Sequence, residues 1–190
     1  MLFAGQNAPA GYRKLRIRQT EITDTAMNLT SDFRNAMAQL GSAITIITTD
    51  GPAGRFGFTA SAVCSVTDSP PTLLVCMNRS SFAHAKFKEN GVLCVNVLSG
   101  QHQNLSAIFA NSQLRSEERF LHEQWLTLET GSPVLATAVA SVDCTLSTSH
   151  EVGSHSVFYC EVRQIRHHQA GDGLVWFNRQ FHTLSAQPYR

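Results

Sequence analysis

Residues 57–77 read GFTASAVCSVTDSPPTLLVCM, and this stretch decides the class of fold. Its first half, together with Phe56, predicts a strand over 56–66 that is rich in small residues. The turn-forming residues Asp68-Ser69-Pro70-Pro71 end this strand, and residues 72–77 predict a second, fully apolar one. Because the break between them is too short for a crossover helix, the two strands are expected to be neighbours in one sheet.

The rest of the chain continues this pattern of short strands. Further strands are expected over residues 43–48, 92–98, 134–147, 156–165 and 174–177. Short helices are expected from a cap at Thr30 or Ser31 to residue 40, and over residues 80–88 and 101–110. Since strands and helices do not alternate regularly, the sequence predicts a mainly β fold, an antiparallel barrel with a few short α-helices.

The length of 190 residues fits one domain with a substantial core. The first thirty residues differ from the remainder, because a basic patch at residues 13–18 is followed by a polar stretch. We therefore expect a flexible arm over residues 1–30 and a single folded domain over residues 31–190. The arm has no apolar segment of the kind found in secretory signals.

Composition limits the possible partners. A net charge of +1 argues against binding to nucleic acid, and no apolar run reaches the roughly 18 residues of a membrane span. The five cysteines are odd in number and form no CxxC pair, which argues against a metal site and favours buried thiols in a reducing cytoplasm. With 43% hydrophobic and only 15% charged residues, the surface suits an oligomer interface.

Glycine-rich motifs exclude several classes of enzyme. The segment Gly51-Pro-Ala-Gly54-Arg-Phe-Gly57 has neither GxGxxG spacing nor a GK[ST] ending, and it is typical of a hairpin turn. The chain also lacks the GxSxG elbow of serine hydrolases. A bound nucleotide would therefore need another kind of site.

Two segments could form such a site. The small side chains of residues 59–62 would let a flat ligand approach the backbone, although the same pattern also suits tight packing against a partner subunit. Asn78-Arg79-Ser80-Ser81 lies where a strand gives way to a helix, so its amides and hydroxyls suit a phosphate group. The alternative for this second segment is an ordinary helix N-cap.

Three further positions leave two interpretations open. Asn96 is either a buried structural amide or a contact to a ligand ring. His155, beside Gly153, is either structural or functional. The aromatic residues around Arg179, in the segment 176–182, form either core packing or the wall of a nucleotide site.

Taken in order, these segments resemble the short-chain NAD(P)H:flavin oxidoreductase family, the FMN-binding split-barrel reductases of two-component monooxygenases. The likeness runs from about Phe33 to His182 and is carried by residues 46–68, 70–78 and 93–98, with support from Glu118-Arg119-Phe120, Gly153-Ser154-His155 and residues 173–182. Within this family the chain is most similar to the reductases of pyrimidine (uracil) degradation, followed by those of 4-hydroxyphenylacetate 3-monooxygenase.

The resemblance implies a homodimeric split barrel that holds FMN or FAD at the subunit boundary. It implies flavin-binding roles for three groups of residues: Thr59, Ala60, Ser61 and Ala62 along the ring, with Val75 and Cys76 behind it; Asn78, Ser80 and Ser81 near the phosphate; and Asn96, Val97 and Leu98 at the end of the ring. It also implies that His155 meets the nicotinamide and that Arg179 and His182 bound the opening.

The implied activity is reduction of FMN or FAD by NADH or NADPH, with reduced flavin diffusing to a partner monooxygenase. Two departures affect the site: Ser154 stands where the family often has an acidic residue, and Asn111 stands where a glycine is common. A non-catalytic split-barrel carrier of flavin or haem is the alternative from another class. A pyridoxamine-phosphate-oxidase-like enzyme is disfavoured because Arg79 alone supplies too few cations for its phosphate.

Overall fold

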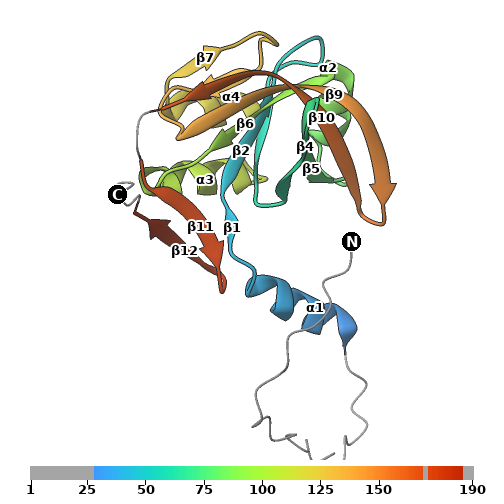
Figure 1. Cartoon of the computed structure of the whole chain (residues 1–190), viewed down its shortest axis with the longest axis vertical. Coiled ribbons are helices and arrows are strands. Elements are labelled where there is room, and N and C mark those ends of the chain that lie inside the picture. Colours follow the sequence, from blue (N-terminus) through green and yellow to red (C-terminus); the bar gives the residue numbers. More distant parts are fainter. Residues whose placement is uncertain (1–27, 169–170, 186–190) are drawn as a thin grey trace, which may run out of the picture.

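The computed structural model describes residues 28–168 and 171–185, and the main elements of this part are antiparallel sheets (Figure 1). The largest sheet has seven strands in the spatial order β3-β2-β6-β9-β10-β5-β4. Their bounds are β2 (Thr45–Thr49), β3 (Phe56–Ala60), β4 (Val63–Asp68), β5 (Pro71–Asn78), β6 (Val92–Val97), β9 (Ala140–Val152) and β10 (His155–His167). Every neighbouring pair runs antiparallel, which confirms the predicted class.

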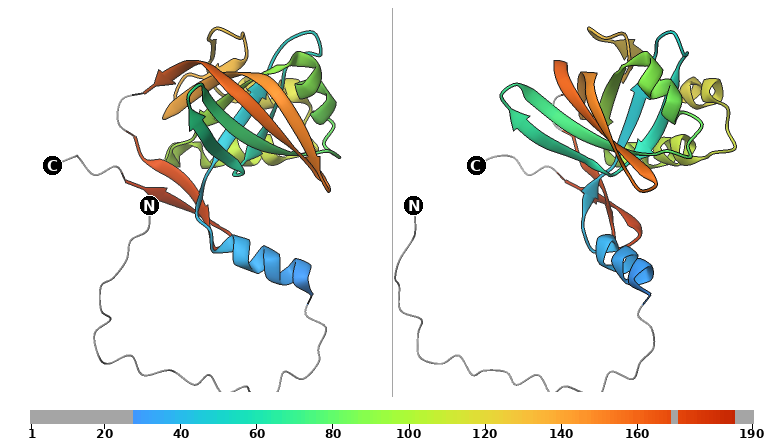
Figure 2. Two further views of the ribbon diagram at one scale, coloured as in Figure 1. Left: turned by 45° about the vertical axis from the view of Figure 1, so that its right-hand side comes forward. Right: turned by 90° about the vertical axis from the view of Figure 1, so that its right-hand side faces the viewer.

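The connection between β3 and β4 closes this sheet into a barrel. These strands occupy opposite edges of the sheet, yet Ser61 and Ala62 alone join them. Three Cα steps span at most about 11 Å, so the sheet must curl until its edges meet. Figure 2 shows this curl, and β3 and β4 are not hydrogen-bonded neighbours. The barrel is therefore split at this point, as the family resemblance implied.

Smaller elements surround the barrel. A second sheet has the order β1-β11-β12, with β1 (Ser42–Ala43), β11 (Gly173–Phe177) and β12 (Gln180–Leu184), and β7 (Trp125–Thr127) pairs with β8 (Pro133–Leu135). The helices are α1 (Leu29–Ala38), α2 (His84–Asn90), α3 (Gln103–Ala110) and α4 (Ser116–Arg119), with 3₁₀ turns at Gly100–His102 and Phe120–His122. No helix among the described residues is long and apolar enough to span a membrane.

Two expected strands are wrong in extent. The strand expected over 56–66 is broken at Ser61 and Ala62, where the chain passes from one sheet edge to the other. The strand expected over 134–147 is divided into β8 and β9, because residues 133–135 pair with β7 instead of β6. Both breaks depend on which strands become partners, and local β propensity carries no information about that choice.

The N-terminal expectations are only partly covered by the structure. Most of the flexible arm expected over residues 1–30 lies outside the described residues, and helix α1 already includes Leu29 and Thr30. The N-cap residue is Asn28, and not Thr30 or Ser31 as expected. The side-chain oxygen of Asn28 accepts a hydrogen bond from the Ser31 N–H.

The central strand β2 connects two apolar clusters. Ile47 packs inside the barrel with Val75, Phe87 and Phe158, whereas Ile46 packs outside it with residues of α3 and β8. Consecutive side chains of a strand point to opposite faces, so both isoleucines are fully buried only because both faces of β2 are covered. Burial of each such side chain contributes about 1.5–3 kcal/mol.

Helix α3 approaches β3 closely at Gly57. A Cβ added there would lie 2.6 Å from Cε1 of Phe109 and 3.2 Å from the carbonyl oxygen of Ile47. Phe109 is itself fully buried, so its ring has little room to move. The glycine in this small-residue strand is therefore required for helix packing.

Replacement of Gly57 by alanine should destabilise the fold. Because the added methyl overlaps the Phe109 ring, we expect the free energy of unfolding to fall by about 1–3 kcal/mol in urea titrations. Gly173→Ala is the matched control, since a Cβ at Gly173 meets nothing within 4 Å. Equal stability of the Gly57→Ala and Gly173→Ala variants would contradict this account of the contact.

Candidate active site

The larger of the two described cavities has a volume of about 860 Å³ and lies beside β3. Three segments line it: Phe56, Gly57 and Phe58 of β3; Asn78, Ser80, Ser81, Phe82 and Ala83 after β5; and residues 112–117 with Arg119. This volume is in the upper range of small-molecule sites in proteins. Several of the predicted phosphate-binding residues are therefore gathered around one cavity.

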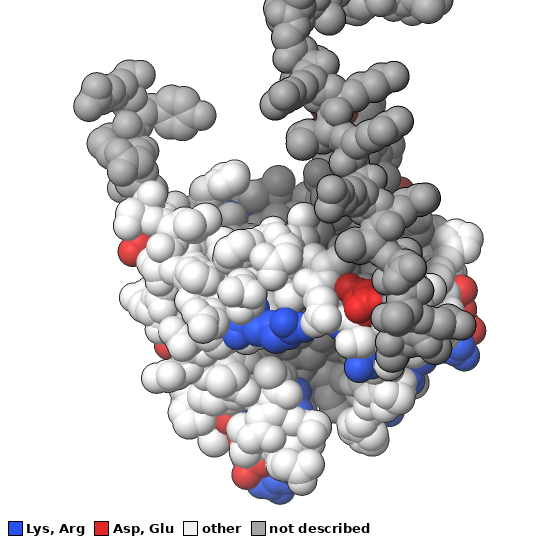
Figure 3. All heavy atoms as spheres, turned by 90° about the horizontal axis from the view of Figure 1, so that it is seen from below, with Lys and Arg blue, Asp and Glu red and all other residues white. Residues whose placement is uncertain are grey.

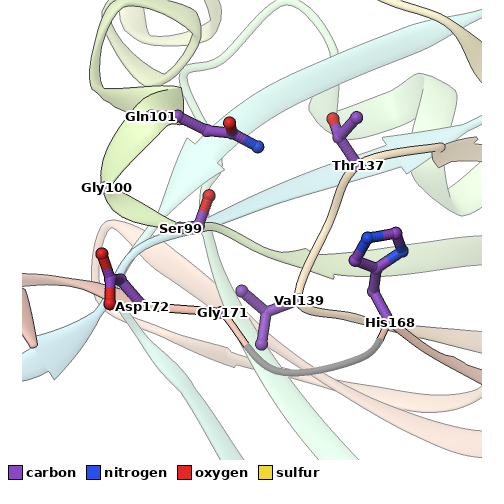
Figure 4. Close-up of a pocket in the computed structure, with 8 residues that line it drawn as sticks. All are labelled: Ser99, Gly100, Gln101, Thr137, Val139, His168, Gly171 and Asp172. Atoms are coloured by element: carbon purple, nitrogen blue, oxygen red, sulfur yellow. The ribbon is translucent and has the colours of Figure 1, made fainter. Parts of the chain in front are cut away.

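The smaller cavity, of about 250 Å³, is polar and contains none of the predicted residues (Figure 4). Its lining comes from three segments of the chain: Ser99, Gly100 and Gln101; Thr137 and Val139; and His168, Gly171 and Asp172. The larger cavity is therefore the candidate site.

The gap between β3 and β4 offers unused backbone donors. Ser61 and Ala62 are exposed and lie outside both strand ladders. Their N–H groups have no hydrogen-bond partner among the described residues, whereas the Ala62 carbonyl accepts a bond of 3.0 Å from the Cys76 N–H. Two adjacent donors at the open edge of a barrel suit the polar edge of a flat ligand.

The residues around this gap are held in place by the fold. The hydroxyl of Thr59 donates to the Ser106 carbonyl of α3 at 2.6 Å, and the Ala60 carbonyl accepts from the Thr45 hydroxyl at 2.9 Å. Val63 pairs with Val75, which is fully buried. The structure thus places Ser61 and Ala62 beside Val75 and Cys76, but none of the predicted ring residues 59–62, 75 and 76 lines the larger cavity.

Asn78 organises the turn that follows β5. Its side-chain oxygen accepts hydrogen bonds of 2.9 Å from both the N–H and the hydroxyl of Ser80, and its carbonyl accepts one from the Ser81 N–H. Helix α2 begins later than expected, at His84, and its N-cap residue Ala83 makes no side-chain cap bond. Asn78, Ser80 and Ser81 therefore form a separate polar turn at the cavity instead of an ordinary N-cap.

His155 lies next to this turn. It pairs with Asn78 across the β5–β10 ladder, and its Nδ1 lies 2.9 Å from the Ser154 hydroxyl. The nearby Arg79 forms an ion pair of 3.0 Å with Glu151 and also donates to the Gly153 carbonyl. The exposed imidazole is thus brought to the phosphate end of the predicted site.

The ring contact expected for Asn96 is not present in the structure, because its side chain is fully buried. The amide nitrogen donates to the Ile46 carbonyl and the Thr48 hydroxyl, and the amide oxygen accepts from the Leu135 N–H and the Ser141 hydroxyl. Asn96 is therefore the structural amide of the two alternatives.

The two residues after Asn96 do not line the cavity either. Leu98 is fully buried, and its backbone is used in bonds to Ile44 and Leu174, while Val97 is half-buried and pairs with Thr45. The backbone at the end of β6 is bonded to Ile44, Val139 and Leu174 of the same chain.

Arg179 and His182 are also separated from the cavity within one chain. Both lie in the β11–β12 hairpin of the second sheet. Arg179 donates to the Asn35 side chain of α1 at 2.6 Å, and His182 Nε2 lies 3.2 Å from the Phe177 carbonyl oxygen. The hydrogen bond from Arg179 to Asn35 therefore attaches α1 to the hairpin.

Comparison with known proteins agrees with this geometry. A model of the flavin reductase like domain matches residues 37–185. The FMN reductase (NADH) RutF of Serratia proteamaculans is 50% identical over 173 residues, covering 89% of this chain and 98% of that protein.

The chain belongs to the flavin reductase-like family.

Solved structures of the family share the fold. A proposed flavin reductase from Haemophilus somnus superposes with a TM-score of 0.79 at 49% identity, covering 81% of this chain and 98% of that one. A homologue of nitrilotriacetate monooxygenase component B from Mycobacterium thermoresistibile gives a TM-score of 0.76 at 25% identity, covering 85% and 91%. The predicted family resemblance is thus confirmed.

Arg119 is a residue of this flavin reductase-like site that reasoning from the sequence did not assign. Its guanidinium donates to four carbonyls, those of Gly57, Phe109, Asn111 and Leu114, at 2.8–3.3 Å. Burial lowers the pKa of this guanidinium, and its Nε is buried without a partner among the described residues. Arg119 therefore fixes one cavity wall to β3, and the triplet Glu118-Arg119-Phe120 was the available signal.

Replacement of Arg119 by lysine should loosen this wall. An ammonium group cannot satisfy four carbonyls that a planar guanidinium reaches, so we expect a loss of about 1–3 kcal/mol of folding free energy in urea titrations. Arg163→Lys is the control, because Arg163 makes only an exposed ion pair with Glu161 and a bond to Thr145. An Arg119→Lys variant as stable as the wild type would show that the four hydrogen bonds from Arg119 to carbonyls do not stabilise the fold.

Proposed function

We propose that this chain reduces FMN or FAD with NADH, NADPH being the alternative donor, and releases the reduced flavin to a monooxygenase. The observation that carries this function is the pair of N–H groups at Ser61 and Ala62, which have no partner among the described residues and directly follow β3, the strand that lines the cavity at its other end. The sequence resemblance given above points to a pyrimidine-ring-opening monooxygenase as the acceptor. Five free thiols and the use of NADH support a cytoplasmic location.

The residues of the site fit a flavin. The Ser61 and Ala62 N–H groups bind the polar edge of the ring, while Val75 and Cys76 form the backing of this edge. Asn78, Ser80 and Ser81 hold the phosphate through an amide and hydroxyls. When bound, the nicotinamide supplies a hydride and the flavin accepts it, so the protein needs mainly to position both groups and exclude water.

His155 positions the nicotinamide in this proposal. Its imidazole is exposed beside Asn78, and the contact between its Nδ1 and the Ser154 hydroxyl fixes the direction of the ring. Ser154 thus supplies the orienting contact at a position where the family often has a carboxylate. Arg179 and His182 could reach the opening only from a second subunit, since within one chain they lie on the other sheet.

An assay of the purified chain tests this function. We expect NADH to be oxidised in air only when FMN or FAD is added, as followed by absorbance of the nicotinamide. In stopped-flow measurements, His155→Ala should slow the hydride step about ten-fold or more while the Kd for FMN stays the same, because an orienting contact is lost.

His167→Ala is the matched control for this assay, since His167 is an exposed histidine at the far end of the same strand. A rate unchanged in His155→Ala would remove His155 from the mechanism. A wild-type chain that binds flavin but oxidises no NADH would instead support the non-catalytic carrier.

We also propose that the chain acts as a homodimer. Helix α1 projects away from the barrel, and none of its residues is buried (Figure 1). Leu29, Phe33 and Met37 recur at a spacing of four residues, so their apolar side chains share one face, and they are 79%, 60% and 46% exposed.

Replacement of Phe33 by aspartate should disrupt this dimer. A carboxylate placed in the apolar stripe of α1 must be desolvated on association, so we expect a monomer by light scattering at concentrations where the wild type is a dimer. Arg34→Glu, at an exposed position of the same helix, is the control. Identical masses for the Phe33→Asp and wild-type chains would rule out α1 as the interface.

A further inference from the structure

His84 is a half-buried histidine that connects the segment after β5 to strand β10. Its Nε2 lies 2.9 Å from the Ser156 hydroxyl, and its ring stacks on Phe158 with centroids 5.6 Å apart. Ser156 is fully buried, and His84 is the only side-chain partner of its hydroxyl among the described residues. Because a buried hydroxyl without a partner is costly, this contact holds the imidazole in one position.

The backbone of His84 is bonded to the polar turn that lines the cavity. Its N–H donates to the Ser81 carbonyl at 3.0 Å, and the Ser81 N–H donates to the Asn78 carbonyl at 3.1 Å. Asn78 and Ser80 are exposed, so the turn itself has little packing to hold it. The side chain of His84 therefore attaches this turn to the barrel.

The partner of His84 lies on the strand that carries His155. Ser156 directly follows His155, and these two residues pair with Met77 and Asn78 of β5. The contact between His84 and Ser156 thus lies between the turn proposed to hold the flavin phosphate and the residue proposed to meet the nicotinamide.

The placement of donors matters at this turn because its own cation is already paired. Arg79 forms an ion pair of 3.0 Å with Glu151. Figure 3 likewise shows basic and acidic side chains on one face of the molecule, without a broad patch of basic ones among the described residues. A phosphate at the turn would then be held by neutral hydrogen bonds, and these weaken steeply when the donor is misplaced.

His84 is suited to hold the turn as a neutral group. Burial lowers the pKa of its imidazole, the charges of Lys88 and Arg79 lower it further, and Glu151 raises it. A lowered pKa keeps the ring uncharged at neutral pH. His84 also does not line the cavity, so it can affect a ligand only through other residues.

We propose that His84 is a positioning residue that, through its contact with Ser156, sets the phosphate-binding turn 78–81 against β10. This inference rests on the proposed function, since it takes the turn as the site of the flavin phosphate. It makes that function more specific by adding a residue that determines preference for flavins that carry a phosphate group.

The test compares FMN with riboflavin, which has the same ring system but no phosphate. Binding of each flavin to the full chain is titrated by flavin fluorescence. His84→Ala should raise the Kd for FMN about ten-fold, because Ser81 and Ser80 are no longer held in place, and should leave the Kd for riboflavin unchanged. His84→Gln places an amide near the position of Nε2, so it should bring the Kd for FMN back to within about three-fold of the wild type.

Ser156→Ala removes the other partner of the same contact. If His84 acts through Ser156, this variant weakens FMN binding to a similar degree, and the double variant binds FMN no more weakly than either single one. His150→Ala is the matched control, because His150 is an exposed histidine whose ring also packs against an aromatic ring of β10, that of Tyr159. Its Kd values for both flavins should equal those of the wild type.

Three results would overturn the role of His84. The first is a Kd for FMN that His84→Ala leaves unchanged. The second is an equal loss of FMN and riboflavin binding, which marks a general effect on the fold, and the third is additive losses in the double variant. A wild-type chain that binds neither flavin would overturn the proposed function as well, so the two failures are distinguishable.

Discussion

The link of two residues between β3 and β4 constrains the whole molecule. Because Ser61 and Ala62 connect opposite edges of a seven-stranded sheet, the sheet must close on itself, yet β3 and β4 do not pair with each other where these edges meet. The same link leaves two N–H groups without partners among the described residues. One constraint therefore accounts for both the barrel and the donors of the proposed flavin site.

Much of the fold could be predicted from the sequence, because its strands are separated by clear turn residues. The hairpin expected at residues 51–57 joins β2 and β3, and the apolar stretch before Asn78 is β5. The break at Ser61 and Ala62 could not be predicted, since small residues are compatible with both a continuous strand and a crossing between sheet edges. Only the pairing of β3 with β2 and of β4 with β5 decides between them.

The candidate site was predictable where its residues are close in sequence. Asn78, Ser80 and Ser81 form one turn and line the cavity, whereas residues 59–62 run from β3 into the link to β4 and do not line it. Asn96 needed long-range information, because its buried partners Leu135 and Ser141 come from other segments. Arg119 is similar, since its role depends on carbonyls of β3 and α3. A polar residue in an apolar strand does not reveal whether its partner is protein or ligand.

Two arginine side chains near the cavity are bonded to other protein groups, which agrees with a protein that releases its flavin. Four carbonyls occupy the guanidinium of Arg119, and Glu151 with the Gly153 carbonyl occupies that of Arg79. Hydroxyls and amides are then left to hold the flavin phosphate in the proposed site, and such neutral bonds are weaker than charge-assisted ones. Weak phosphate contacts of this kind suit a proposed site from which reduced flavin leaves for a second enzyme.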